Sequence, residues 1–377
     1  MDTGKENDAG TSADLRLLVL AAGTGVGQNI LATLAGRRHG LTLIATSSVV
    51  NEPSLFEFDV VYRVPPTVEG DAFEGTLLDI MDRERVDLVI PCRDDDVVFL
   101  AALGERRPEL AHRLLCGSVE PARVICDKWL SAEFCTRHEL PFAASIIGGS
   151  VAERAAFVAR HGFPLVAKPR RGYASLDVYL IWNEGQLQRT LDQDEYIVQQ
   201  FLGDPQVVTD YLAAMEARGI PLCYTLQGTK HSIQVLIAPD GSIAHVICTL
   251  TRQDRRRSKW AGPDTDSAAR EIGAKCAHAF AQAGWRGPLN IQCQRAPDGG
   301  LFIHEFNGRF TGGTLSRWLV GFDEVGPTFE RFTGRPIPAD RTPPPEAVET
   351  FDCVVGRVAD PVDVALFERD RVWRRRR

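Results

Sequence analysis

Two polar segments late in the sequence carry side chains that could bind a metal ion. One reads NIQ at 290–292 and the other reads FIHEFNGR at 302–309. Each predicts a short strand, and the Pro-Asp-Gly-Gly stretch between them predicts a turn. Because side chains alternate along a strand, Glu305, Asn307 and Arg309 should point to the same side.

Gln292 should face these three side chains if the two strands pair. One carboxylate, two amide oxygens and one guanidinium would then share a wall. That set suits a magnesium ion that holds a polyphosphate. The arginine could then stabilise the negative charge of a phosphoryl group in transfer. The alternative is a solvated hairpin face, although such faces usually carry mixtures of Lys, Glu and Thr.

Length and composition limit the number of domains and the class of protein that can carry this group of side chains. A chain of 377 residues exceeds one ordinary core and predicts two or three domains. The apolar content of 44% and charged content of 25% are typical of a soluble globular protein. The net charge of −7 argues against a nucleic-acid partner, and no apolar run approaches membrane-spanning length.

Two further features favour a cytoplasmic protein. Residues 1–14 are polar, lack the apolar stretch of a signal peptide and predict a loose tail. The nine cysteines include no C-x-x-C pair and no metal-ligand spacing. They are therefore interpreted as reduced thiols.

The first part of the chain, 15–125, predicts a parallel, doubly wound α/β unit, because expected strands alternate with expected helices. The strands are expected at 15–22, 41–46, 59–64 and 86–91, and the helices at about 27–38 and 72–85. The glycine loop at 23–27 has the spacing G-x-G-x-G, and no acidic residue closes the second strand. A tight strand-to-helix turn is therefore favoured over a dinucleotide site.

From residue 127 the pattern becomes α+β. Helices are expected at 128–139, 150–161, 184–192, 208–217, 265–283 and 323–333, and strands at 163–169, 178–182, 195–202, 232–238 and 242–250. The run 204–222 is interpreted as an insertion and 252–259 as a charged loop. Three prolines at 343–345 mark a linker, and the terminal arginines are interpreted as a solvated end.

Taken together and in order, these motifs resemble the ATP-grasp superfamily, closest to its carbamoyl-phosphate-synthase-like and amino-acid-ligase branch. The order is a Rossmann-like unit, a D-K helix, a V-x-K-P strand, a hinge strand, a hairpin, N-x-Q and E-x-N-x-R. The resemblance implies a Rossmann-like pre-ATP-grasp domain at 15–125 and a two-lobed ATP-grasp domain at 126–337. Lobe A would span about 126–198 and lobe B about 199–337, followed by a C-terminal extension at 338–377.

The resemblance also implies which residues bind ATP. Lys128 and Lys168 match the two nucleotide lysines, and Lys168 would reach the α and β phosphates. The hinge that presents backbone groups to adenine matches Gln199, Gln200, Phe201 and Leu202. The alternatives are surface lysines and ordinary strand pairing.

The metal-site residues find counterparts in the same family. Gln292, Glu305 and Asn307 match its magnesium ligands, with manganese as the other ion. One carboxylate alone would hold the metal weakly, so it should bind chiefly as the ATP complex. Arg309 matches the arginine that contacts the transferring phosphoryl group.

A basic run lies where the family places residues that face the acceptor substrate. It contains Arg252, Arg255, Arg256, Arg257 and Lys259. Arg257 is our candidate for a catalytic residue that stabilises a tetrahedral anion. A solvated surface loop is the alternative.

Three departures from the family pattern stand out. The loop 170–175 after the lysine strand has a single glycine, so Arg170 or Arg171 would compensate for missing backbone contacts. Lys230 and His231 stand where an acidic ribose ligand is expected. Gly308 replaces the usual proline, which should cost only rigidity.

The resemblance therefore implies an ADP-forming carboxylate–amine ligase that uses ATP and acts through an acyl phosphate on small-molecule substrates. It also implies a homodimer. Two alternatives remain open. One is carbamoyl-phosphate-type phosphorylation of bicarbonate or carbamate, and the other is a regulatory protein that binds ATP without catalysis.

Overall fold

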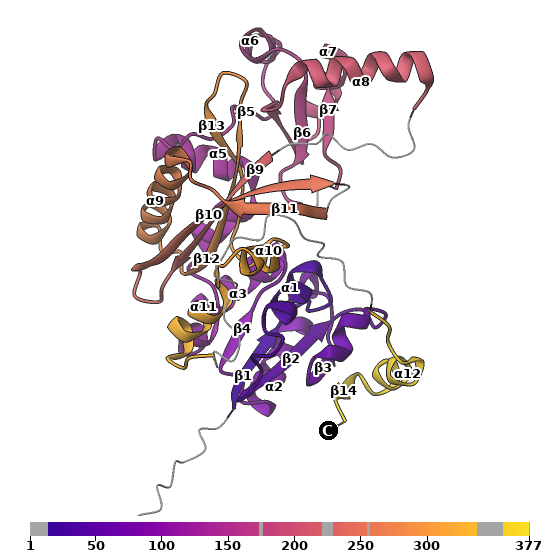
Figure 1. Ribbon diagram of the computed structural model, residues 1–377, viewed down its shortest axis with the longest axis vertical. Helices are drawn as coiled ribbons and strands as arrows, with labels where there is room; N and C mark the ends of the chain where they lie inside the picture. Colours follow the sequence, from indigo (N-terminus) through magenta and orange to yellow (C-terminus); the bar gives the residue numbers. More distant parts are fainter. Residues whose placement is uncertain (1–13, 173–175, 221–228, 255–256, 338–356, 377) are drawn as a thin grey trace, which may run out of the picture.

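The structure is a computed structural model that describes residues 14–172, 176–220, 229–254, 257–337 and 357–376, without the side chains of 253–259. Three sheets organise the chain (Figure 1). A mostly parallel sheet lies at one end, a five-stranded antiparallel sheet in the middle and a small four-stranded sheet at the other end. No helix in these ranges is long and apolar enough to span a bilayer.

The first sheet has the strand order β14-β3-β2-β1-β4. Its strands are β1 (Leu15–Val19), β2 (Leu41–Ser47), β3 (Val60–Arg63), β4 (Leu88–Ile90) and β14 (Val372–Arg374). All pairings are parallel except that of β14 with β3. The expected doubly wound α/β unit is therefore confirmed.

Helices cover both faces of this sheet. They are α1 (Gly25–Thr33), α2 (Asp71–Arg83), α3 (Asp94–Arg106), α11 (Val325–Thr333) and α12 (Pro361–Asp370). One core joins the sheet to α1, α11 and α12, and another joins it to α2 and α3. Helix α1 begins two residues earlier than expected because the Thr24 side chain accepts a hydrogen bond from the Gly27 N–H and caps it. It ends at Thr33, five residues before the expected end.

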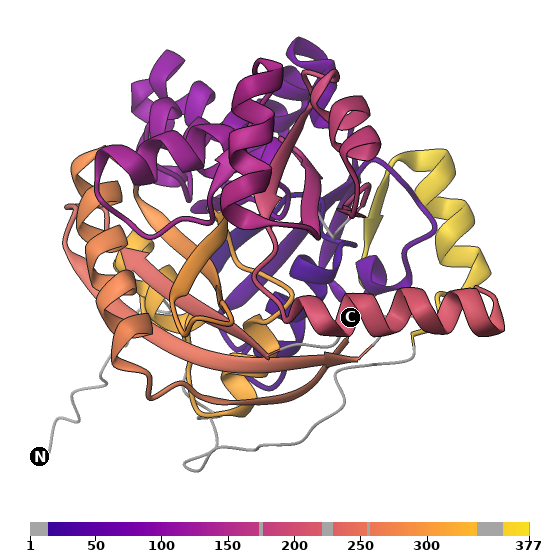
Figure 2. The ribbon, with the colours of Figure 1, turned by 90° about the horizontal axis from the view of Figure 1, so that it is seen from above.

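The middle sheet has the order β11-β10-β9-β12-β13 and is antiparallel throughout. Its strands are β9 (Thr229–Ile237), β10 (Ile243–Asp254), β11 (Arg257–Pro263), β12 (Gly287–Arg295) and β13 (Leu301–Asn307). Helix α9 (Ser267–Gln282) covers one face in both views (Figures 1 and 2). The same apolar core includes α3 and α4 (Val119–Cys126), so the first unit and lobe B are packed together.

The small sheet has the order β5-β8-β6-β7. Its strands are β5 (Ser145–Ile146), β6 (Leu165–Pro169), β7 (Tyr179–Ile181) and β8 (Tyr196–Gln200). The helices of this region are α5 (Lys128–Arg137), α6 (Val151–His161), α7 (Glu184–Leu191) and α8 (Pro205–Arg218). The sheet with α6 and α7 corresponds to lobe A. Helix α5 packs through Phe134 and Cys135 into the core of the middle sheet, and α8 is the inserted segment, within the range expected for lobe B.

Backbone hydrogen bonds join this lobe directly to strand β13. The Ala143 N–H donates to the Ile303 carbonyl, and the Ile303 N–H donates to the Pro141 carbonyl, both at 2.7 Å. Because residues 141–143 lead straight into β5, which pairs with β8, the metal-site strand and the hinge strand are neighbours in space.

Two expectations about the chain were wrong. The run 252–259 is a hairpin rather than a loop, because β10 extends to Asp254 and β11 begins at Arg257. The C-terminal arginines are not simply a solvated end. Arg374 lies in β14 and pairs with the buried Glu84, and the Arg375 N–H donates to the Asp59 carbonyl at 2.9 Å. Strand pairing satisfies backbone groups that an exposed edge would leave open.

Candidate active site

Strands β12 and β13 form the expected polar wall. Glu305 lies directly opposite Gln292, and Asn307 lies opposite Asn290. Opposed residues of an antiparallel pair share a face, so these carboxamide and carboxylate groups are gathered on one side. Glu305 keeps 26% of its side chain exposed, whereas Asn307 is 5% exposed. The predicted facing of Gln292 and Glu305 is confirmed.

A β-bulge brings His304 to the same wall, which the sequence analysis missed. The pairing steps from Gln292–Glu305 to Cys293–Ile303, so His304 has no partner across the strand. Ile303 and Phe306 both lie in the apolar core. The two residues between them, His304 and Glu305, therefore both turn to the opposite face.

The two expected lysines, at the start of α5 and near the end of β6, lie close to this wall. Lys128 is the first residue of α5, and its Nζ lies 3.7 Å from Glu305 Oε1 and 3.4 Å from the Gly172 carbonyl oxygen. Lys168 stands near the end of β6. The charged groups that act on it are Glu305, Lys128 and Lys230. Residues far apart in sequence thus share one cleft.

Asp127 ties the two lysine-bearing segments together. Its carboxylate caps α5 by accepting from the N–H groups of Trp129 and Leu130, at 2.9 and 3.3 Å. It also accepts from Arg170 at 2.9 Å, and the Lys128 N–H donates to the Arg170 carbonyl at 3.0 Å. Arg170 therefore fixes the loop after β6. Arg171 is 76% exposed, and its Nε lies 3.6 Å from the same carboxylate, so a compensating phosphate contact by either arginine stays a prediction.

Burial dominates the electrostatics of the cleft. It lowers the pKa of Lys168 to about 8, with Glu305 opposing the change and Lys128 and Lys230 adding to it. Burial, followed by the same three lysines, lowers the pKa of His304 well below its usual value. The imidazole is therefore neutral at pH 7, beside a concentration of positive charge that suits a polyphosphate.

The hinge begins where β8 ends, at Gln200, so Phe201 and Leu202 follow the strand. The Gln200 N–H donates to the Ala144 carbonyl at 2.9 Å. The Gln199 side chain is 1% exposed, and its Nε2 donates to Ser145 Oγ at 3.0 Å. Their assignment to adenine remains a proposal.

Arg309 lies beyond the strand that was expected to carry it, because β13 ends at Asn307. Its Nε donates to Asp94 Oδ1 at 2.8 Å, and the residue is 8% exposed. Although burial opposes it, the ion pair with Asp94 raises the pKa of Arg309, so the guanidinium remains charged. Asp94 is the first residue of α3, so the first unit supplies the partner of this arginine.

Steric crowding explains why position 308 is a glycine, which the sequence did not reveal. A Cβ placed there would lie 2.8 Å from Trp285 Cζ2 and 3.3 Å from Ile125 Cγ2. Trp285 is fully buried, so neither proline nor any other side chain fits without displacing it. The glycine lets the chain turn from the metal wall towards Asp94.

The structure describes only part of the basic run 252–259. The Arg252 guanidinium lies over the Trp260 ring, 5.0 Å from its centroid, and the residue is exposed. Arg255 and Arg256 lie outside the described residues, and so do the side chains of Arg257 and Lys259. The catalytic role of Arg257 stays a prediction.

The residues of this cleft fit a magnesium nucleotide. Of the buried polar atoms that find no hydrogen-bond partner within the described ranges, three lie at this wall or at the expected hinge, namely Gln199 Oε1, His304 Nε2 and Asn307 Nδ2. Buried polar groups are nearly always satisfied in a folded protein, so a bound polar molecule accounts for them. The carboxylate and amide oxygens suit magnesium, and the lysines suit phosphates.

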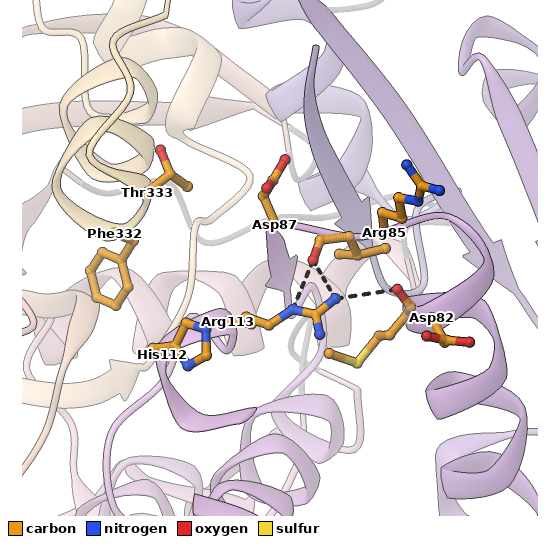
Figure 3. Close-up of a pocket in the computed structure, with 9 residues that line it drawn as sticks. Asp82, Arg85, Asp87, His112, Arg113, Phe332 and Thr333 are labelled. Carbon is orange, nitrogen blue, oxygen red and sulfur yellow. Dashed lines mark hydrogen bonds between the residues drawn. The ribbon is translucent and has the colours of Figure 1, made fainter. Parts of the chain in front are cut away.

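Two other features of the molecule lie away from this cleft. A cavity of about 460 Å³, shown in Figure 3, is lined by Asp82, Arg85, Asp87, His112 and Arg113, with Phe332 and Thr333 from α11. Arg113 there donates to the carbonyl oxygens of Met81 and Val86 rather than to the open space.

The second feature is a cluster of His231, Asp264 and Asp266. His231 Nδ1 lies 2.7 Å from Asp264 Oδ2, and Asp266 caps α9 and pairs with Arg295. Since His231 alternates with Lys230 along β9, it faces away from the cleft. These side chains satisfy one another and are best explained as structural.

Comparison with known proteins gives similar folds but no sequence match. No family model matches the chain, and no curated protein matches it. N5-carboxyaminoimidazole synthetase from Staphylococcus aureus has a TM-score of 0.64 at 11% identity, over 87% of this chain and 79% of that one. Biotin carboxylase from Campylobacter jejuni has a TM-score of 0.60 at 15% identity, over 87% and 73%.

A third similar structure was solved with nucleotide and anion. It is the biotin carboxylase domain of 2-oxoglutarate carboxylase from Hydrogenobacter thermophilus, a dimer in complex with MgADP, ADP and bicarbonate. Its TM-score is 0.60 at 15% identity, over 86% of this chain and 71% of that one. At such identities the similarity establishes a shared fold.

Proposed function

We propose, from the ATP-grasp fold that this chain shares with those enzymes, that it is an ATP-dependent carboxylate–amine ligase that releases ADP and phosphate. One observation carries the proposal. Lys128 of α5 lies 3.7 Å from Glu305 of β13, with Lys168 of β6 beside both. Lysines that face a carboxylate–amide wall suit a metal-bound polyphosphate, because the lysines bind phosphate oxygens and the wall binds the metal.

Each residue of the cleft has a role in this proposal. Lys128 and Lys168 hold the phosphates by charge. Gln292, Glu305 and Asn307 offer oxygen ligands to magnesium or manganese, which would neutralise phosphate charge when bound. Arg309, held by Asp94, offers a fixed positive charge for the phosphoryl group in transfer.

The proposed reaction has two steps. A carboxylate oxygen of the substrate attacks the γ-phosphorus of ATP, the bond to the bridging oxygen breaks, and ADP leaves. The amine nitrogen then attacks the carbonyl carbon of the acyl phosphate. Phosphate leaves with the bonding electrons, and the nitrogen loses a proton to give the amide. Positioning and charge are the contributions of the protein.

Bicarbonate phosphorylation is the second candidate. The Hydrogenobacter thermophilus domain, with the same fold, was solved with bicarbonate beside MgADP. The described residues contain one ATP-grasp unit, without the second one of a true carbamoyl-phosphate synthetase, which favours the amine ligase. A binding-only regulatory protein would not need the Glu305, Asn307 and Arg309 set.

A nucleotide-product assay tests the proposal. Purified protein is supplied with MgATP, each member of an amino-acid matrix and, separately, bicarbonate, and the nucleotides are separated by chromatography. We expect ADP release that depends on one acid and one amine, with a product mass equal to their sum less water. Release of AMP and pyrophosphate contradicts the mechanism, and ADP release that depends on bicarbonate alone supports the second candidate.

Location and assembly are part of the same proposal. The seven cysteines within the described ranges are all free, which supports a reducing, cytoplasmic environment. The dimer reported for the Hydrogenobacter thermophilus domain supports a homodimer. Small molecules rather than nucleic acid or membrane are the proposed partners.

A further inference from the structure

The cleft contains a side chain that the family resemblance does not explain. His304 is the extra residue of the β13 bulge, so the strand has shifted its register at that point. Bulges often re-aim a side chain beside an active site. Without the shift, alternation would place Ile303 on the cleft face and His304 in the core.

The imidazole is left with an unused polar atom. His304 Nε2 is buried and finds no hydrogen-bond partner among the residues that the structure describes. The charged groups that act on the ring are Lys168, Lys230 and Lys128, which are the lysines of the proposed phosphate site. A buried ring nitrogen without a partner destabilises the fold unless a ligand satisfies it.

The position of His304 selects one part of a nucleotide. Glu305 and Asn307, on its C-terminal side, form the metal wall. On its other side, Ile303 is hydrogen-bonded to residues 141 and 143, which lead into the strand that pairs with the hinge. A nucleotide with its phosphates at the wall and its base at the hinge has its sugar between them.

We propose that His304 Nε2 binds a ribose hydroxyl of the nucleotide, in place of the missing acidic ligand. This inference rests on the proposed function. An imidazole Nε2 donates or accepts a hydrogen bond according to its protonation and tautomer, and a hydroxyl group can do both. A phosphate oxygen only accepts. The hydroxyl is therefore the nucleotide group that suits this ring in either form.

The sequence context agrees with this assignment. Where an acidic ribose ligand is expected, the chain has Lys230 and His231. His231 pairs with Asp264 at 2.7 Å and is turned away from the cleft, and Lys230 adds positive charge to it. His304 is thus the neutral polar group that the cleft offers between wall and hinge.

Calorimetric titration with MgATP, Mg-2′-deoxy-ATP and Mg-3′-deoxy-ATP tests the inference without reference to turnover. We expect the wild-type protein to bind at least one deoxynucleotide about fivefold more weakly than ATP, as loss of one neutral hydrogen bond predicts. His304→Leu should bind ATP weaker by a similar factor and no longer distinguish the three nucleotides. His304→Asn should recover part of the preference.

His245→Leu is the matched control. His245 also has a buried Nε2 without a partner in the described structure, but it lies on β10 beside Glu324 and Arg317 rather than among the lysines. It should retain the wild-type preference, and unfolding midpoints identify any variant that has lost its fold.

Three results overturn the inference. They are an unchanged preference in both His304 variants, an equal loss for all three nucleotides, which would indicate packing against the base, and no preference in the wild type. Failure of the wild type to bind ATP would overturn the proposed function instead.

Discussion

Among single residues, Lys168 should make nucleotide binding depend on pH. Burial lowers its pKa to about 8, so the free protein loses this positive charge as the pH rises through 8. We expect the association constant for MgATP to be constant between pH 7 and 7.5 and to fall at higher pH, by up to about tenfold per unit. Equilibrium titrations across that range measure it.

Lys168→Arg is the control for this pH dependence. A guanidinium keeps its charge to much higher pH, so the variant should bind MgATP with little change across the same range. If the variant and the wild type decline in parallel, another group is responsible and Lys168 does not hold the phosphates.

Glu305 is the residue on which turnover should depend most. Glu305→Gln removes the only carboxylate of the metal set while keeping its size. We expect turnover to fall on the order of 100-fold or more because phosphate charge is no longer balanced. The ADP-release assay measures it. Glu216→Gln, at an exposed position on α8, should be neutral. Retained activity in the Glu305 variant would remove this residue from the metal site.

At the scale of elements, helix α3 should act on catalysis through Asp94, a positioning residue for Arg309. Asp94→Asn should lower kcat by about tenfold or more while the KM for ATP changes little, because a guanidinium that loses its fixed geometry loses transition-state contacts. Asp94→Glu should recover part of kcat.

Asp95→Asn tests whether this effect is specific. Asp95 is the next residue of the same helix turn and is exposed, so its substitution alters the charge of the helix start without touching Arg309. Equal losses in both variants would show that the helix terminus, rather than the ion pair, matters.

Some helices and strands could be predicted from the sequence, and others could not. Helix α7 and strand β2 appear within one residue of their expected ends, since local apolar periodicity and caps define them. The facing of Gln292 and Glu305 followed from alternation alone. The bulge at His304 did not, because a register shift depends on the partner strand. The β10–β11 hairpin was missed because its tip is a run of arginines with no turn signal.

For the whole molecule, the C-terminal helix should contribute strongly to stability. Phe367 on α12 is fully buried and packs edge to face with Phe56, at 6.2 Å between ring centroids. Phe367→Ala should lower the free energy of unfolding by about 3 kcal/mol, by removing apolar contacts and leaving a cavity. Urea denaturation measures this change. Val362→Ala, 58% exposed on the same helix, should be near neutral.

The packing of α12 against the first unit could not be predicted from the sequence. The aromatic residues Phe367 and Trp373 stand in a short polar stretch without strong periodicity, and their partner Phe56 lies in the first unit. Long-range pairing of this kind leaves no local signal. The ATP-grasp fold itself was predicted correctly, because an ordered series of motifs carries more information than any one of them.

The antiparallel pairing of β14 with β3 bears on how the protein is made. Arg374 and Tyr62 are hydrogen-bonded although 312 positions separate them. During synthesis, the edge strand β3 of the earliest sheet therefore keeps unpaired N–H and C=O groups until the residues between β3 and β14 have left the ribosome. A nascent chain stalled near residue 340 would display that edge, with Glu84 lacking its Arg374 partner, and would be a natural client for chaperones.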